Sequence, residues 1–174
     1  MQEITIQIPF DYQDFIKSQK LVWGFMSKGF IKNNTIYVIV AILCLIVALE
    51  PINRERFPLF ISFAGGYLFY MLSSWMGFYE RRTKFFKRVK NLANNSAVNA
   101  SGCSFIFSDY GIEYSDAEKL YKHSWSLFGR FVIIDATILI ILKETSTVLF
   151  TLSKKELGDS DYTAVCEVLK EKLG

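Results

Sequence analysis

The sequence is poor in the residues that build metal centres and disulfide frameworks. Its 174 residues include one histidine, His123, and three cysteines, Cys44, Cys103 and Cys166. An odd number of cysteines at wide spacing is not a disulfide framework, and no cysteine pair has the spacing of a zinc site. This cysteine usage is typical of a reducing compartment, or of a domain on the cytosolic side of a membrane.

Signatures of catalysis are also missing. The sequence contains no P-loop and no G-x-G-x-x-G motif. His123 has Ser124 beside it and Asp109, Glu113 and Asp116 nearby, but nothing indicates the strained nucleophile turn or the oxyanion site that a catalytic triad needs. We therefore predict that the protein is not an enzyme, that it has no catalytic residues, and that it holds no metal and no cofactor.

The charge balance is mild and excludes little. Twenty Lys and Arg residues against 17 Asp and Glu give a net charge of +3, which by itself does not argue for a nucleic-acid partner. The first residues, MQEITIQIPFDYQD, are acidic and alternate between polar and apolar side chains. We expect no nucleic-acid partner and no signal peptide.

What the sequence has instead is two long segments without charge. Residues 36–49 are fourteen apolar residues, and residues 58–79 are twenty-two residues bounded by Arg56 and Glu80. A transmembrane helix needs roughly 20 mostly apolar residues, so the first segment alone is ambiguous and the second decides. We predict a transmembrane helical hairpin over residues 33–79. The alternative is a buried helix pair in a soluble bundle.

Basic residues predict the orientation of this hairpin. Lysines precede the first segment and six Lys or Arg residues follow the second, whereas the turn between them has only Arg54 and Arg56. Because positive charge marks the cytoplasmic side, we expect both termini in the cytoplasm. The two segments hold no ionisable residue, which argues against an ion path through them.

Small residues predict how the two helices pack. At helical spacing they form a stripe on each helix, which lets helix backbones approach closely. We call this the small-residue seam, and homo-oligomerisation through the same seam is left open. Its members are Ala41, Cys44 and Ala48 on the first helix and Ser62, Gly66, Ser73 and Gly77 on the second.

The remaining segments predict a strand-rich domain. Residues 1–32 read as a strand and an amphipathic helix, residues 80–101 as a basic connector and a linker, and residues 102–174 as antiparallel strands followed by a helix with a Ser153–Glu156 capping box. The predicted fold class is an α+β membrane protein, with a two-helix transmembrane hairpin and a cytosolic antiparallel sheet capped by a C-terminal helix. This layout resembles a pleckstrin-homology-like barrel.

Three stretches of the tail resemble the YcxB-like family of small bacterial two-span membrane proteins. They are FIFSDYGIEYS, HSWSLFGRF with Trp125 in the tryptophan position, and VLFTLSKKEL, in which Ser153 replaces a proline and Lys154-Lys155 is the basic pair. The resemblance implies the bacterial inner (cytoplasmic) membrane and a cytosolic C-terminal domain. It supplies no established activity.

From these features we predict a non-enzymatic interaction module that binds a protein, a peptide or anionic membrane lipid. A membrane-bound immunity protein against a toxin is one form of this hypothesis, and a subunit of an oligomeric transport or pore complex is the alternative. A curved sheet with an exposed edge can also add a partner strand. The predicted contact residues are Arg81, Arg82, Lys84, Lys87, Arg88, Trp125, Lys154 and Lys155.

Overall fold

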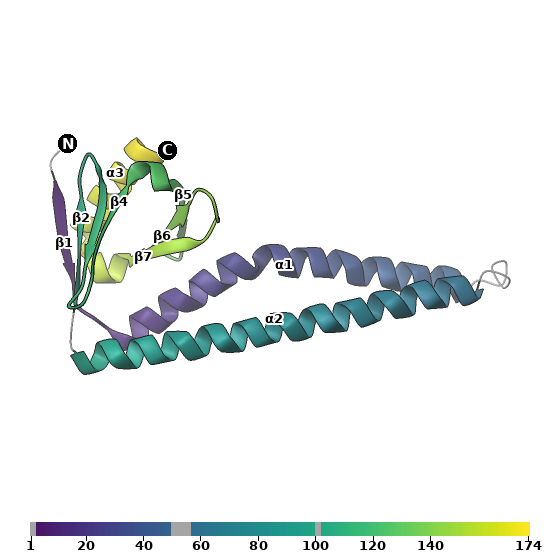
Figure 1. The fold of residues 1–174 in the computed structure, drawn as a ribbon. Helices are drawn as coiled ribbons and strands as arrows, with labels where there is room; N and C mark the ends of the chain where they lie inside the picture. Colours follow the sequence, from purple (N-terminus) through teal and green to yellow (C-terminus); the bar gives the residue numbers. More distant parts are fainter. Residues whose placement is uncertain (1–2, 50–56, 100–101) are drawn as a thin grey trace. The chain divides into compact units, whose positions relative to one another are not determined.

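The computed structural model describes residues 3–49, 57–99 and 102–174 (Figure 1). These residues divide into two compact units. The β-rich unit comprises residues 1–23 and 89–174, and the helical unit comprises residues 24–88. Each unit is described by itself.

Two long helices, α1 (Tyr12–Leu49) and α2 (Phe57–Asn99), contribute residues to both units. Asp11 caps α1, because its carboxylate accepts a hydrogen bond of 2.8 Å from the Asp14 backbone N–H. Residues 94–99, predicted as part of a linker, are the last turns of α2. They contain no glycine or proline, the residues that most disfavour a helix interior, so this polar stretch can be helical.

In the helical unit, aromatic rings join α1 to α2. Phe30 stacks on Phe78 with ring centroids 4.5 Å apart, and its edge contacts Trp75 at 5.9 Å. Further along, the rings of Tyr37 and Tyr67 meet edge to face at 5.7 Å. These contacts place the helix interface on the aromatic residues of both helices.

The small-residue seam is only partly at this interface. Ala41 is buried, but its buried counterparts on α2 are Ala64 and Met71. Cys44 and Gly77 are half-buried, Ser62, Gly66 and Ser73 are exposed, and the side chain of Ala48 lies outside the described part of the chain. Most of the stripe predicted on α2 is therefore exposed, and the buried residues of this part of α2 are Ala64 and Met71.

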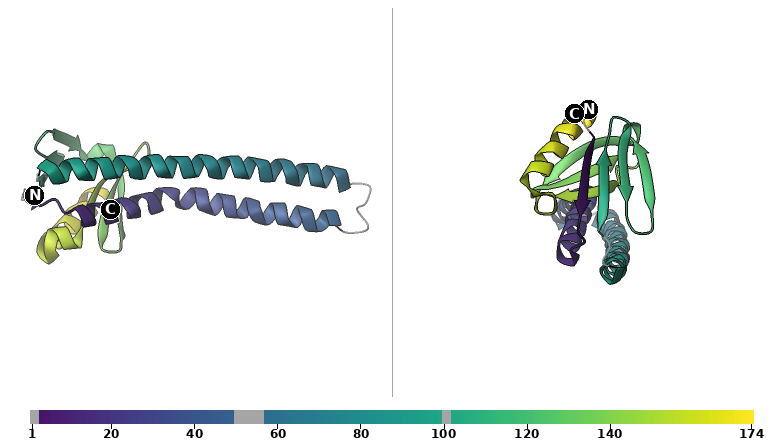
Figure 2. Two further views of the ribbon diagram at one scale, coloured as in Figure 1. Left: turned by 90° about the horizontal axis from the view of Figure 1, so that it is seen from below. Right: turned by 90° about the vertical axis from the view of Figure 1, so that its left-hand side faces the viewer.

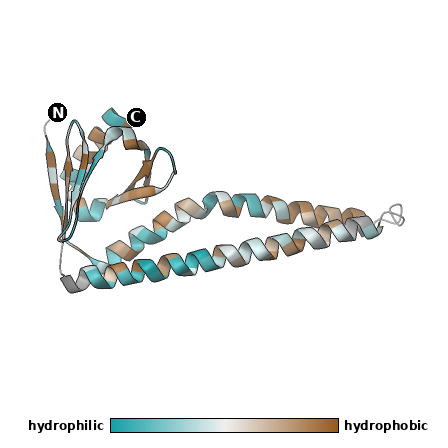
Figure 3. Ribbon diagram, in the orientation of Figure 1, coloured by the Kyte–Doolittle hydropathy of each residue, from teal (hydrophilic) through white to brown (hydrophobic). Residues whose placement is uncertain are grey.

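The predicted transmembrane hairpin is wrong. Within residues 3–49, 57–99 and 102–174, no helix combines the length and apolar character of a membrane span. In α1 the apolar run begins only at Ile36, because Lys32, Asn33 and Asn34 precede it. In α2 the uncharged residues 58–79 include nine that are glycine, serine or tyrosine, so absence of charge did not mean high hydropathy (Figure 3).

The predicted localisation, orientation and fold class depended on those spans and are wrong as well. A two-span protein of the bacterial inner membrane with both termini in the cytoplasm required two membrane-crossing helices. The α+β membrane-protein fold class required the same two helices. Over the residues that the structure describes, there are three α-helices, one short 3-10 helix and two antiparallel sheets.

The β-rich unit contains two antiparallel sheets, which we call sheet A and sheet B. Sheet A has the strand order β1-β2-β3-β4 and sheet B the order β5-β6-β7. A short 3-10 helix, η2 (Trp125–Leu127), connects them. The strands are β1 (Ile4–Ile8), β2 (Cys103–Phe107), β3 (Gly111–Ser115), β4 (Leu120–Ser124), β5 (Phe128–Ile134), β6 (Thr137–Leu142) and β7 (Val148–Ser153).

The N-terminal strand joins the sheet that follows the helices. Ile4 pairs with Phe107 and Ile8 with Cys103, so β1 lies antiparallel to β2 although residues 9–102 separate them in sequence. Their alternation explains the register: Ile6 and Ile8 are buried on the same face as Phe105 and Phe107.

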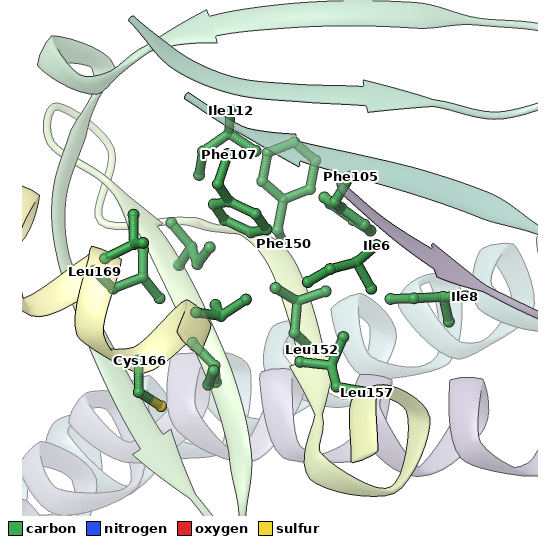
Figure 4. Close-up of a cluster of buried hydrophobic side chains, with 14 of the residues drawn as sticks. Ile6, Ile8, Phe105, Phe107, Ile112, Phe150, Leu152, Leu157, Cys166 and Leu169 are labelled. Carbon is green, nitrogen blue, oxygen red and sulfur yellow. The ribbon is translucent and has the colours of Figure 1, made fainter. Parts of the chain in front are cut away.

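Both sheets and the C-terminal helix share one hydrophobic core (Figure 4). Strand β6 is buried on both faces, since the four residues from Ile138 to Ile141 are at most 1% exposed. The core also takes Phe107 and Ile112 from sheet A and Leu152 from sheet B. Such a core requires both sheets to be complete, because each supplies one face.

Helix α3 (Lys154–Leu173) packs against strands β1, β5 and β7 (Figure 2). The predicted capping box is confirmed: the Ser153 side chain accepts from the Glu156 backbone N–H, and the Glu156 carboxylate accepts from the Ser153 N–H. Gly158 interrupts the helix at φ 78° and ψ 170°, a backbone conformation that is open to glycine and strained for other residues.

Gly111 gives a direct test of the β3–β4 pairing. A Cβ atom there would lie 1.9 Å from the backbone oxygen of His123, so Gly111→Ala must push the two strands apart. We expect the free energy of unfolding to fall by about 2 kcal/mol, the cost of forcing an atom into a packed site. Urea denaturation of the full-length chain measures it. The control is Ser115→Ala in the same strand, expected within about 0.5 kcal/mol of the parent; equal effects would contradict the pairing.

Candidate functional site

A groove with a volume of about 620 Å³ lies in the β-rich unit beside the free edge of β7. We call it the β7 groove. Its floor is aromatic and comes from three consecutive strands of sheet A and from the last strand of sheet B. The floor residues are Phe105 of β2, Tyr114 of β3, Tyr121 and His123 of β4, and Phe150 of β7.

Ring contacts hold this floor together. Phe150 lies at the centre, with ring centroids 5.3 Å from Phe105, 5.8 Å from Tyr114 and 5.8 Å from His123. Tyr121 stacks with Tyr114 at 6.3 Å and with His123 at 6.0 Å. Phe150 is buried whereas Tyr121 is 46% exposed, so the cluster is anchored in the core and open on the groove side.

The two strands that border the groove, β4 and β7, contribute different surfaces to it. From β4 come Tyr121 and His123, alternate residues that share one face of the strand. From β7 come three consecutive residues, 149–151, and the β6–β7 register shifts at Leu149. The groove therefore runs along the backbone edge of β7 and across the inner face of β4.

On its other side the groove meets the first residues of α1 and the last turns of α2. Phe10, Phe15 and Leu92 supply apolar surface there. An ion pair ties the start of α1 to the start of α3: the Lys155 ammonium lies 2.7 Å from a carboxylate oxygen of Asp14.

Acidic residues dominate the rim. The acidic residues that line the groove are Asp11, Asp116, Glu118 and Glu156. The basic lining residue is Lys119. Asp116 accepts hydrogen bonds from the backbone N–H groups of Glu118 and Lys119, both 2.8 Å, and from the Tyr114 hydroxyl at 2.9 Å. These bonds fix the 116–119 turn at the rim.

The surroundings of the rim stabilise the charged form of Asp116 and the neutral forms of Tyr114 and Cys103. Burial alone would raise the pKa of Asp116, but its hydrogen bonds hold that pKa below its ordinary value. Burial raises the pKa of Tyr114, and its hydrogen bond to Asp116 raises it further. Burial, together with Glu156 and Asp116, raises the pKa of the Cys103 thiol to about 11.

The predicted contact residues are not among the residues that line this groove. Five belong to α2 in the helical unit and are exposed: Arg81, Arg82, Lys84, Lys87 and Arg88. Lys84 pairs with Glu80 on the next turn, and the Arg82 guanidinium lies 5.9 Å from the ring centroid of Phe86. The stretch is an exposed basic face of a helix that continues without a break.

The three predicted contact residues in the tail are each engaged within the β-rich unit. Lys154 pairs with Asp159 at 2.7 Å, and Lys155 pairs with Asp14. The Trp125 indole N–H donates to the Ser108 carbonyl oxygen at 2.9 Å, and its ring contacts Phe128. Trp125 thus ties η2 to the β2–β3 turn.

His123 belongs to the aromatic floor of the groove. Its ring contacts Tyr121, Phe128 and Phe150. Across the described ranges, no three His, Cys, Asp or Glu side chains come together in a way that could hold a metal ion.

Sequence reasoning missed the groove, although part of its signal was present. Ile112 and Tyr114, and likewise Tyr121 and His123, alternate on two strands that pair directly. That alternation indicates one aromatic face. It could not show that Phe150, from the other sheet, completes the floor.

Comparison with known proteins adds no relative. No protein-family model, no curated protein and no solved structure matches the chain. The resemblance to the YcxB-like family stays a prediction.

Trp125→Phe tests the tie between η2 and the β2–β3 turn. The substitution keeps an aromatic ring but removes the N–H donor to the half-buried Ser108 carbonyl. We expect the free energy of unfolding to fall by about 1–2 kcal/mol, as for other lost hydrogen bonds. The control is Tyr110→Phe in the same turn, whose side chain is 88% exposed and should be neutral. No difference between the two variants would contradict a structural role for Trp125.

The raised pKa of Cys103 predicts slow alkylation at neutral pH. Because burial disfavours the thiolate, the fraction of thiolate stays small below the raised pKa. The alkylation rate of Cys103 should therefore rise about tenfold per pH unit from about pH 7 to about pH 10. A Cys44→Ser, Cys166→Ala chain leaves this thiol alone, and mass spectrometry follows its reaction with iodoacetamide. Urea-unfolded protein is the control, with a plateau near the ordinary thiol pKa. A plateau there in the folded protein too would refute the prediction.

Proposed function

We propose that this chain is a non-enzymatic binding protein, and that the β7 groove holds an extended segment of a partner polypeptide as an added strand. The observation that carries the proposal is the position of β7. It is the last strand of sheet B, and its edge residues 149–151 line an open groove.

An open strand edge is a template for another strand. Among the described strands β7 pairs with β6 alone, so one side of its backbone has no strand partner. Proteins that do not use such an edge commonly cover it or charge it. Here the edge borders a cavity of about 620 Å³, large enough to admit the side chains of a bound segment.

The aromatic floor suits the side chains of an added strand. Alternate side chains of that strand would point the same way, towards the inner face of β4. Tyr121 is the exposed ring on that face. It stacks with Tyr114, which in turn stacks with Phe150. Main-chain hydrogen bonds to β7 would supply affinity, and the aromatic floor would supply selectivity.

The basic residues predicted from the sequence do not enter this proposal. Lys154 and Lys155 are held in ion pairs with Asp159 and Asp14, and the basic stretch of α2 belongs to the other unit. The proposal therefore concerns a polypeptide partner rather than anionic lipid.

Binding of peptides to the full-length chain tests the proposal. Three dye-labelled decapeptides alternate threonine with lysine, glutamine or glutamate, so that each forms a strand with one chemically distinct face. We expect at least one to raise fluorescence anisotropy, and Tyr121→Ala to weaken its binding about tenfold through loss of aromatic contact. Methylating alternate backbone nitrogens of that peptide should abolish binding, because strand addition needs their N–H groups.

The matched control is Tyr110→Ala. Tyr110 is 88% exposed at the β2–β3 turn and does not line the groove, so its loss should leave peptide affinity unchanged. Thermal unfolding of both variants verifies that they fold. Failure of all three peptides to bind, or equal losses from Tyr121→Ala and Tyr110→Ala, would overturn the proposal.

A further inference from the structure

We infer that the segment received by the β7 groove is basic, with lysine or arginine at alternate positions facing the aromatic floor. This inference rests on the proposed function and names the chemistry of the partner. It comes from two features of the groove: the charge of its rim and the exposed rings beneath that rim.

The rim carries an excess of negative charge. Four carboxylates, those of Asp11, Asp116, Glu118 and Glu156, line the groove together with a single lysine, Lys119. A concave surface lined mainly by one sign of charge concentrates ligands of the opposite sign. An acidic segment would meet repulsion there, and a neutral one would gain nothing from it.

The charges of these carboxylates are only partly offset by neighbouring cations, because Lys155 acts on Asp11 and Glu156 and Lys119 acts on Asp116. Within the described ranges, none of the four has a Lys or Arg nitrogen within 4 Å. Asp11 and Glu156 bind neutral N–H and O–H groups at the starts of α1 and α3, and Asp116 binds the 116–119 turn. Hydrogen bonds of this kind fix the side chains in place and leave the negative charge available.

The floor beneath the rim suits a cation better than it suits an aliphatic side chain alone. Tyr121 is 46% exposed, and its ring stacks with Tyr114, which is bonded to Asp116. A cation over such a ring is attracted by the negative face of its π-system. The aliphatic stem of a lysine or arginine would cover the ring while its charged end reached the rim.

The geometry of a strand places these groups in the right order. An added strand on β7 presents every second side chain to the inner face of β4, where Tyr121 and His123 lie two residues apart. Basic residues at alternate positions would therefore each meet an aromatic ring of β4. The intervening residues of the bound segment would point to the opposite face, and their residue types are not specified.

Glu118 is the residue that tests the charge without disturbing the fold. Unlike the other three, its carboxylate caps no helix and no turn among the described contacts; only its backbone N–H bonds to Asp116. Glu118→Lys reverses the charge at the rim, and Glu118→Gln removes it more gently. Glu144→Lys is the matched control, because Glu144 is exposed in the β6–β7 turn and does not line the groove.

The experiment uses the three decapeptides with the full-length parent and these variants. We expect the lysine–threonine peptide to bind the parent at least about tenfold more tightly than the glutamate–threonine peptide at low salt. Glu118→Lys should weaken binding of the lysine–threonine peptide and strengthen binding of the glutamate–threonine peptide, so that the ratio of the two affinities falls. Glu118→Gln should give a ratio between those of the parent and Glu118→Lys. Glu144→Lys should leave the ratio unchanged, and raising the salt to about 0.5 M should reduce it in the parent.

The outcomes separate this inference from the proposed function. If the glutamine or glutamate peptide binds best, and Tyr121→Ala still weakens it, the groove binds strands and the inference of a basic partner is wrong. A lysine preference shifted equally by Glu118→Lys and Glu144→Lys reflects net charge alone and also overturns the inference. If no peptide binds, the proposed function itself fails.

Discussion

The packing of Phe150 against sheet A is the contact on which the β-rich unit depends. Phe150 comes from the last strand of sheet B, yet its ring lies within 6.2 Å of rings from β2, β3, β4 and β5. It joins the two sheets at the point where no hydrogen-bonded ladder does so. A large aromatic side chain can bridge such a gap because it buries more apolar surface than any aliphatic residue.

The groove follows from the way this contact is made. Phe150 holds the sheets together through side chains, so the edge of β7 and the inner face of β4 meet without backbone pairing. Rings that would otherwise be fully enclosed remain accessible from one side, as Tyr121 does. The same arrangement that completes the core leaves a surface with an aromatic floor, a strand edge and an acidic rim.

Sequence patterns predicted the elements whose causes are local. The Ser153–Glu156 capping box depends on residues that are close together in the sequence, and it lies where expected. The helix pair was misread because charge was counted and hydropathy was not, although glycine, serine and tyrosine add little to it. The groove could not be predicted, since its floor joins residues from Phe105 to Phe150 through tertiary packing.

The pairing of β1 with β2 has a consequence for how the chain is made. Ile4–Ile8 leaves the ribosome first, but its partner strand ends at Phe107 and is synthesised last of the two. At about 5–20 residues per second, β1 waits several seconds with neither edge paired. During that interval its alternating isoleucines have no partner strand, and the polar residues Thr5 and Gln7 interrupt what would otherwise be a continuous apolar segment.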